Sequence, residues 1–286
     1  MTNAAPAYTL VQLTDLHLVA DGADLPGGVD TAALLERALQ TVLDAGIGPA
    51  ALVLTGDLTD HGRPEEYRRL RAIVEPAAER LDAPVVFAAG NHDDRAALRE
   101  HLLGVAGSDD PLDHSVRVGD LRIIVLDSTV PGHPHGSVEP RQLEWLRAEL
   151  AEPAPAGTVL ALHHPPLPSA APLASAVPLV NRRDLAAALE GSDVRLVLAG
   201  HTHVASAGTL GGIPVWTGGP LATTVDGLVR GSALRTLGAP SVSRIDLFAE
   251  DLITTSVPVG APVVDEVPAA EMEPALSRFR AGAGLA

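Results

Sequence analysis

The sequence predicts an α/β fold, and two observations carry this prediction. Up to about residue 204, six short apolar runs alternate with segments of helical periodicity. Short continuous runs of this kind are typical of strands that are buried on both faces of a sheet. After about residue 204, β-like segments separated by Gly, Ser and Pro follow one another without a strong helix between them. This order of elements is the layout of an α/β domain with additional strands at its end.

The apolar runs predict the strands of the sheet. They are LVQL (10–13), ALVL (51–54), VVFAA (85–89), RIIVL (122–126), TVLAL (158–162) and RLVLA (195–199). The segments between them predict helices. In TAALLERALQTVLDA (31–45) apolar residues recur at helical spacing, with Asp30 or Thr31 as the N-cap and Gly46 as the stop signal. A second helix is expected over 64–74, since Pro-Glu-Glu suits a first turn. Residues 139–150 and 183–190 show similar patterns.

The late segments predict antiparallel strands that complete a second sheet. They are GIPVWTGG (212–219), SRIDLF (243–248) and LITTSVPV (252–259). We expect a single domain over residues 1–258 and a C-terminal extension over 259–286, which is either partly mobile or a short helix at EMEPALSRFR (271–280).

Composition and charge exclude several classes of protein. The formal net charge is −16, which disfavours a nucleic acid as partner. The chain has no Cys, so disulfides, thiol catalysis and Cys-ligated zinc are excluded. We find no apolar run long enough for a membrane span and no N-terminal signal peptide, and therefore expect a cytoplasmic protein.

Polar residues follow five of the six apolar runs, at the point where each predicted strand ends. They are Asp15 and His17, Asp57, Asn91 and His92, His163 and His164, and His201 and His203. In open α/β sheets, ligands bind at the carboxyl ends of the strands, where these side chains can converge. Any one of these signals alone also suits a turn, a surface histidine or a satisfied core histidine. Their joint occurrence favours a metal site.

The ligand types indicate how many metal ions are bound. Seven candidate ligands are more than one ion needs, whereas two ions that share a carboxylate would use them all: Asp15, His17, Asp57, Asn91, His163, His201 and His203. A mixture of oxygen and nitrogen ligands suits Mn, Fe or Zn. Two such ions close together can hold a phosphoryl group.

The motifs D-x-H, GD, GNHD, HH and GHTH, in this order, resemble those of the calcineurin-like metallophosphoesterases. The form GNHD–HHPP–GHTH is similar to that of the bacterial class III cyclic nucleotide phosphodiesterases. The loop STVPGHPHG (128–136), followed by QLEWL (142–146), also resembles that group. The resemblance implies a four-layer α-β-β-α sandwich with two facing mixed sheets.

The resemblance also implies a role for each ligand. Asp15, His17 and His203 would hold the first metal; Asn91, His163 and His201 would hold the second; and Asp57 would bridge both. A turn at Gly200 would let His201 and His203 serve different ions. The implied function is hydrolysis of 3′,5′- or 2′,3′-cyclic nucleotides and related phosphodiesters by a hydroxide held between the metals. A glycerophosphodiesterase or a nucleotide-type phosphatase on the same scaffold is the alternative, and a metal-free binding module is a remote one.

Three further histidines are predicted near the substrate. By resemblance, His92 faces the substrate beside Asn91 and is the expected general acid, oriented by Asp93 or a backbone group. The alternative for Asp93 and Asp94 is a helix N-cap. His133 and His135 are expected in a loop over the site, with a plain surface loop as the alternative. For His164, contact with substrate and a structural role stay open.

The positive charges suggest which esters are preferred. All 20 basic residues are Arg, and Arg63 and Arg95, the nearest in sequence to the motifs, are expected to point to solvent. A diester carries one negative charge fewer than a monoester and needs fewer cationic donors, so we expect a preference for diesters. Only 2% of the residues are aromatic, which predicts weak discrimination between bases. The oligomeric state is left open, with a homodimer as one alternative.

Overall fold

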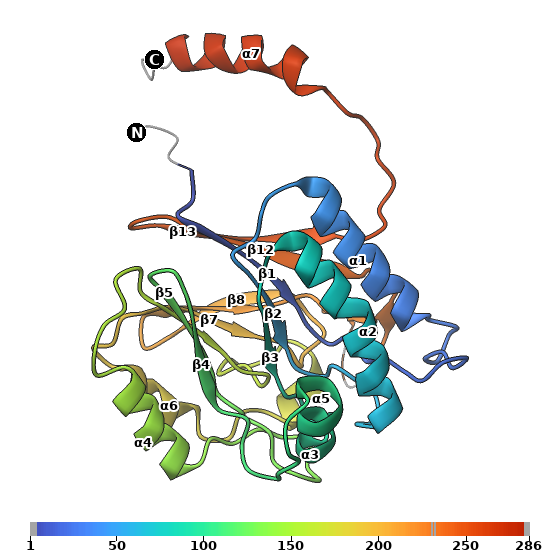
Figure 1. The fold of residues 1–286 in the computed structure, drawn as a ribbon, viewed down its shortest axis with the longest axis vertical. Helices are drawn as coiled ribbons and strands as arrows, with labels where there is room; N and C mark the ends of the chain where they lie inside the picture. Colours follow the sequence, from blue (N-terminus) through green and yellow to red (C-terminus); the bar gives the residue numbers. More distant parts are fainter. Residues whose placement is uncertain (1–4, 230, 232, 283–286) are drawn as a thin grey trace.

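Two sheets face each other between two layers of helices (Figure 1). This is a computed structural model, and it describes residues 5–229, 231 and 233–282. The first sheet has five strands in the order β13-β12-β1-β2-β3, and the second has six in the order β4-β5-β6-β7-β9-β8. Both sheets contain parallel and antiparallel pairs. The four-layer arrangement predicted from the motifs is confirmed.

The first sheet joins strands from both ends of the chain. Its members are β1 (Tyr8–Leu13), β2 (Ala51–Thr55), β3 (Val85–Ala88), β12 (Ser241–Leu247) and β13 (Leu252–Pro258). Strand β1 pairs parallel with β2 and antiparallel with β12. The prediction that the late segments complete the second sheet is therefore wrong for 243–248 and 252–259. Without β12, one edge of β1 would leave backbone groups without partners, and a local pattern does not reveal which strand covers such an edge.

The second sheet contains β4 (His114–Val118), β5 (Leu121–Val125), β6 (Thr158–Ala161), β7 (Val194–Ala199), β8 (Ser206–Leu210) and β9 (Ile213–Thr217). Only the late segment at 212–219 joins it, and β9 pairs parallel with β7 and antiparallel with β8. A small separate hairpin consists of β10 (Thr224–Val225) and β11 (Thr236–Leu237).

Helix α1 (Thr31–Ala45) begins and ends at the residues that the sequence predicts, whereas helix α2 (Pro64–Leu81) is longer than predicted. Helix α1 begins after Asp30, whose side chain accepts a hydrogen bond from the Ala33 amide, and ends at Gly46. Helix α2 runs past the predicted end, because Pro76 does not terminate it and its buried face continues to Ala77. The other helices are α3 (Arg95–Ala97), continued by the π-helical η1 (Leu98–Leu103), α4 (Pro140–Glu149), α5 (Pro172–Ala176), α6 (Arg182–Leu189) and α7 (Ala269–Gly282).

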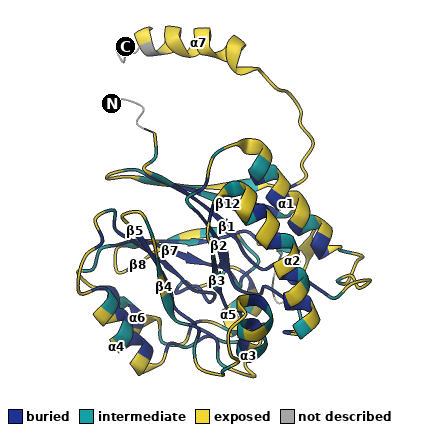
Figure 2. Cartoon of the chain, viewed as in Figure 1, coloured by how far each residue is buried: buried dark blue, intermediate teal, exposed yellow. Residues whose placement is uncertain are grey.

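Three apolar clusters hold the four layers together, as the buried faces in Figure 2 show. The central cluster lies between the sheets and includes Leu10, Val53, Ile123 and Leu198. A second cluster joins α1 and α2 to the first sheet, and a third joins α4 and α6 to the second sheet. This packing fixes the two sheets face to face, so that loops from both can meet at one edge.

The C-terminal helix α7 stands apart from the sandwich (Figure 1), and its surface is largely exposed (Figure 2). A short helix was one of the two expectations for this extension, whose last residues, 283–286, lie outside the described part. Among the described helices, none combines the length and the apolar character needed to cross a membrane.

Candidate metal centre

Loops at the carboxyl ends of five strands carry the seven candidate ligands. Asp15 and His17 follow β1, Asp57 follows β2, and Asn91 follows β3, all in the first sheet. The second sheet contributes His163 after β6 and both His201 and His203 after β7. Backbone hydrogen bonds join the first two loops, since the amides of Asp15 and His17 donate to the carbonyl oxygens of Gly56 and Asp57.

Four of these residues form the first group of ligand atoms. Asp15, His17, Asp57 and His203 each offer one ligand atom, and all four atoms lie within 4.8 Å of one another. The Nε2 atoms of His17 and His203 are 3.1 Å apart, and Oδ1 of Asp15 is 3.5 Å from Nε2 of His203. The structure thus brings together the four residues that were predicted to form the first metal site and the bridge.

The second group is centred on Asn91. Its Oδ1 atom lies 3.2 Å from Nε2 of His163 and 2.9 Å from Nδ1 of His201. The Oδ2 atom of Asp57 lies between the two groups, 3.5 Å from Nε2 of His17 and 3.3 Å from Nε2 of His163. The other carboxylate oxygen of Asp57 accepts a hydrogen bond from the amide of His92. Asp57 is therefore placed as a bridging carboxylate would need to be.

The backbone at these ligands is unusual. Six non-glycine residues in the described part of the chain have a positive φ, and five of them are candidate ligands: Asp15, His17, Asp57, His201 and His203. Residues with side chains rarely adopt this conformation, and it tends to occur at functional sites. Gly200 shows why the loops need small residues, because a Cβ there would lie 2.0 Å from Oγ1 of Thr14.

The hydrogen bonds of the four ligand histidines suit metal binding. Each has one ring nitrogen directed to an oxygen outside the cluster: Oδ1 of Asp60 for His17, and the carbonyl oxygens of Thr55, Val177 and Thr223 for His163, His201 and His203. These oxygens accept, so the outer nitrogen donates, and in the neutral ring the inner nitrogen carries a lone pair. Facing lone pairs at 3.1 Å on His17 and His203 repel each other unless a proton or cation lies between them. The donor set therefore fits metal ions.

In the chain without metal, the pKa values of several buried groups in the cluster are strongly shifted. Burial alone would lower the pKa of His163, but the Asp57 carboxylate outweighs it and raises the pKa to about 9. Burial would raise the pKa of Asp57, yet the nearby His163 and His17 hold it well below its usual range. Burial and the neighbouring His163 lower the pKa of His201 to about 4. The negative charge at Asp57 thus attracts cations into the centre of the cluster.

His92 lies at the edge of the cluster, with its side chain partly exposed. Its Nδ1 atom donates to the carbonyl oxygen of Asp60 at 2.9 Å, and its ring packs edge-on against His17. This leaves Nε2 as the ring nitrogen available to a substrate. The group that orients His92 is therefore a backbone carbonyl.

The two aspartates after His92 have structural partners. Asp93 accepts hydrogen bonds from the amides of Leu58, Thr59 and Gly90 and from the hydroxyl of Tyr67. Asp94 caps α3 by accepting from the Ala97 amide. The N-cap reading holds for Asp94, whereas Asp93 ties the Asp57 loop to the Asn91 loop.

His164 is fully buried, with Nδ1 at 2.9 Å from Oγ of Ser128 and Nε2 at 3.2 Å from the carbonyl oxygen of Pro134. These contacts hold the 128–136 loop against the second sheet, which favours the structural role. The predicted substrate contact of His133 and His135 stays a prediction. Their rings lie 5.1 Å apart, and Pro134 between them lines the cavity described next.

A cavity of about 650 Å³ opens above the ligands. His17, Asp57, Asn91, His92, His201 and His203 line it, so both groups of ligand atoms are accessible from it. The described residues that line it include no Arg, Phe, Tyr or Trp. The expectation that Arg95 points to solvent is wrong: it is buried, pairs with Asp127 at 2.8 Å and donates to Thr129. The guanidinium of Arg95 is thus paired within the fold and does not contribute a positive charge to the cavity.

Asp60 is a site residue that the sequence interpretation missed. Its carboxylate accepts from His17, its carbonyl accepts from His92, and its own pKa is lowered by the hydrogen bond with His17. The only sequence signal is its position in TGDLTDHG, three residues after Asp57.

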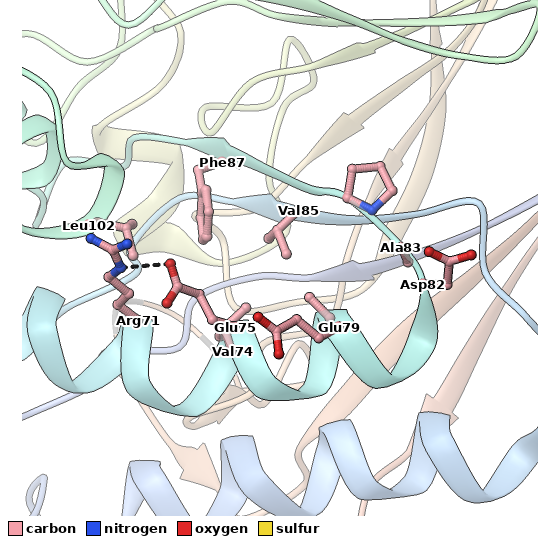
Figure 3. A pocket seen from close by; sticks show the side chains of 11 residues that line it. Arg71, Val74, Glu75, Glu79, Asp82, Ala83, Val85, Phe87 and Leu102 are labelled. Atoms are coloured by element: carbon pink, nitrogen blue, oxygen red, sulfur yellow. Dashed lines mark hydrogen bonds and ion pairs between the residues drawn. The ribbon is translucent and has the colours of Figure 1, made fainter.

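A second cavity, of about 470 Å³, lies between α2 and β3 (Figure 3). Its lining includes Val74, Val85 and Phe87, with Glu75 bound to Arg71 at its rim. None of the candidate ligands lines it, so the chemistry belongs to the first cavity.

Comparisons with known proteins agree with this geometry. Residues 8–205 match the sequence profile of the calcineurin-like phosphoesterases. A probable cyclic nucleotide phosphodiesterase of Rhodococcus erythropolis is 46% identical over 259 residues, or 90% of this chain and 86% of the relative. The cAMP/cGMP dual specificity phosphodiesterase of Mycobacterium tuberculosis is 43% identical over 256 residues, or 89% of this chain and 80% of the relative. The solved structure of a dimetal phosphatase from Danio rerio shares the fold, with a TM-score of 0.66 at 17% identity, over 89% of this chain and 96% of that one. The profile match and these identities show that the chain belongs to the calcineurin-like phosphoesterase family.

Proposed function

We propose that this chain is a phosphodiesterase that uses two metal ions to hydrolyse cyclic nucleotides and related phosphodiesters. The observation that carries the proposal is the position of Asp57, whose Oδ2 atom lies between two groups of His, Asp and Asn ligand atoms at an open cavity. The names of the similar proteins from Rhodococcus and Mycobacterium support the substrate class.

In this proposal, Asp15, His17 and His203 would hold one ion, Asn91, His163 and His201 would hold the other, and Asp57 would contribute to both sites. When bound, the ions lower the pKa of water and neutralise charge on the phosphoryl oxygens. The outer hydrogen bonds of the four histidines fix their tautomers and orient their inner nitrogens.

His92 supplies a proton to the leaving alkoxide in this proposal. Its Nδ1 hydrogen is held by the Asp60 carbonyl, so the protonated ring carries its second hydrogen on Nε2. An alkoxide is a poor leaving group, and a positioned acid on this side of the phosphorus would assist its departure. Asn91 and His92 would also contact the substrate as neutral donors.

Hydrolysis assays on the metal-loaded chain test the function. The substrates are 3′,5′- and 2′,3′-cyclic nucleotides and bis-p-nitrophenyl phosphate, each with Mn²⁺, Fe²⁺ or Zn²⁺, and Asp57→Ala is the matched control. We expect turnover of the diesters that disappears with a chelator and in the control. A metal-loaded chain that hydrolyses none of them would refute the proposal.

The finer points are proposals of the same kind. We propose Mn, Fe or Zn as the ions, a cytoplasmic location, and a catalytic domain over residues 1–258 followed by an extension over 259–286. The separate position of α7 supports this boundary. A homodimer stays an untested alternative to a monomer.

A further inference from the structure

Part of the lining of the cavity above the ligands is apolar. Two segments supply it: α5 with the residues around it, and the β10–β11 hairpin, which contributes Val225 from β10 and Leu234 from the part before β11. We call this part the apolar wall and define it by Pro172, Leu173, Val177, Val225 and Leu234.

Two leucines of the apolar wall are exposed although they line a cavity. The exposed fraction is 62% for Leu173 and 57% for Leu234. Large apolar side chains at the mouth of a functional cavity gain contact area when a ligand covers them. Their exposure therefore indicates a ligand with an apolar group at this position.

Hydrogen bonds anchor both segments of the apolar wall to candidate ligands. Nε2 of His201 donates to the carbonyl oxygen of Val177 at 3.0 Å, at the end of α5. Nδ1 of His203 donates to the carbonyl oxygen of Thr223 at 2.6 Å, and the Val225 amide donates to the carbonyl oxygen of His203. The two histidines that would hold different ions thus also set the position of the two segments. A substrate bound at the ligands has the apolar wall at a fixed place beside it.

The carboxylate of Asp226, which lies near the apolar wall, already has hydrogen-bond and ion-pair partners within the protein. Asp226 lines the cavity, but one oxygen accepts from the Leu228 amide and the other pairs with Arg235. Among the described lining residues there is no Phe, Tyr or Trp on which a base could stack. The apolar wall therefore offers a ligand apolar contact rather than a free charge.

We propose that the apolar wall binds the ester group that stays on phosphorus, and that Leu173 and Leu234 determine specificity. The substrate class is a phosphodiester whose retained group is uncharged and bulky. This inference rests on the proposed function, diester hydrolysis at the metal centre.

Two substrates isolate this contact. Bis-p-nitrophenyl phosphate and methyl p-nitrophenyl phosphate have the same leaving group and the same charge, and they differ in the retained group. In Leu173→Ser and in Leu234→Ser, the ratio of kcat/KM for the aryl diester to that for the methyl diester should fall by roughly threefold to tenfold. For the methyl diester, kcat/KM should fall less, because a methyl group offers little area to the apolar wall. Since both leucines are exposed, neither substitution opens the core, and thermal unfolding checks this.

Leu228→Ser is the matched control, because Leu228 lies in the same hairpin, is 89% exposed and is absent from the cavity lining. Its ratio should equal that of the unsubstituted chain. An unchanged ratio in both wall variants, or an equal loss on both substrates, would overturn the role of the apolar wall. No turnover of either diester by the unsubstituted, metal-loaded chain would instead overturn the proposed function, and this inference with it.

Discussion

Oδ2 of Asp57 lies 3.3 Å from Nε2 of His163, and both side chains are buried. Without metal, this proximity raises the pKa of His163 to about 9 despite its burial, so the ring is protonated at neutral pH. A metal ion needs the lone pair of that nitrogen and must displace the proton.

Metal binding should therefore release protons near neutral pH, and the release should fall once the pH exceeds about 9. Calorimetric titration of the metal-free chain with Mn²⁺, in buffers of different ionisation enthalpy, measures this. His101→Ala, away from the cluster, serves as the control. Proton release that is the same on both sides of pH 9 would contradict the assigned role of His163.

Replacing Asp57 by Ala should lower both metal content and turnover, because each ion loses the ligand that lies between the two groups. Elemental analysis of the purified variant and assays with bis-p-nitrophenyl phosphate measure the two effects. Asp120→Ala, an exposed aspartate in the turn between β4 and β5, should leave both unchanged. Two full equivalents of metal in an active Asp57→Ala chain would refute the bridge.

Replacing His92 by Ala should keep the metal content and slow turnover by roughly 10²–10⁴-fold on substrates with alkoxide leaving groups. The loss should shrink for p-nitrophenyl esters, since p-nitrophenolate leaves without a proton. Comparing kcat for cyclic nucleotides with kcat for bis-p-nitrophenyl phosphate tests this. If both substrates lose the same factor, His92 is not the acid.

A diester should be preferred to a monoester. The described lining of the cavity holds no guanidinium, and Arg95 is occupied by Asp127. We expect kcat/KM to be higher for bis-p-nitrophenyl phosphate than for p-nitrophenyl phosphate under the same metal, beyond the statistical advantage of two identical leaving groups. Preference for the monoester would place the chain among phosphatases instead.

Replacing Asp93 by Ala should destabilise the metal-free chain by roughly 2–4 kcal/mol, because it leaves several donors without their acceptor. Tyr67→Phe removes one donor to Asp93 and the acceptor of the Asp94 amide, and it should cost less, roughly 1–2 kcal/mol. Urea unfolding of both variants measures the difference. Equal losses would mean that the amides of Leu58, Thr59 and Gly90 do not depend on Asp93.

Much of the site could be predicted because its signals are local. Each ligand follows a buried strand, and the ends of neighbouring parallel strands in one sheet meet at one edge, so the convergence of Asp15, Asp57 and Asn91 follows from the order of the strands in the first sheet. The same holds for α1, whose cap and stop residues lie within the segment itself.

What could not be predicted depends on contacts between distant segments. Asp60 becomes a partner of His17 only because the β1 and β2 loops lie side by side. Arg95 is buried because Asp127, from another loop, compensates its charge. The pairing of β1 with β12 joins opposite ends of the chain, and no local pattern encodes it.

The place of β12 beside β1 also bears on when the site can form during synthesis. Asp15 and His17 leave the ribosome early, but the antiparallel neighbour of their strand is made near the end of the chain. His163, His201 and His203 come from the other sheet, which must dock before they reach the first loops. An ion bound to the growing chain would meet only the ligands of the first sheet. Loading of both ions should therefore come after the synthesis of β12 and the closure of the two sheets.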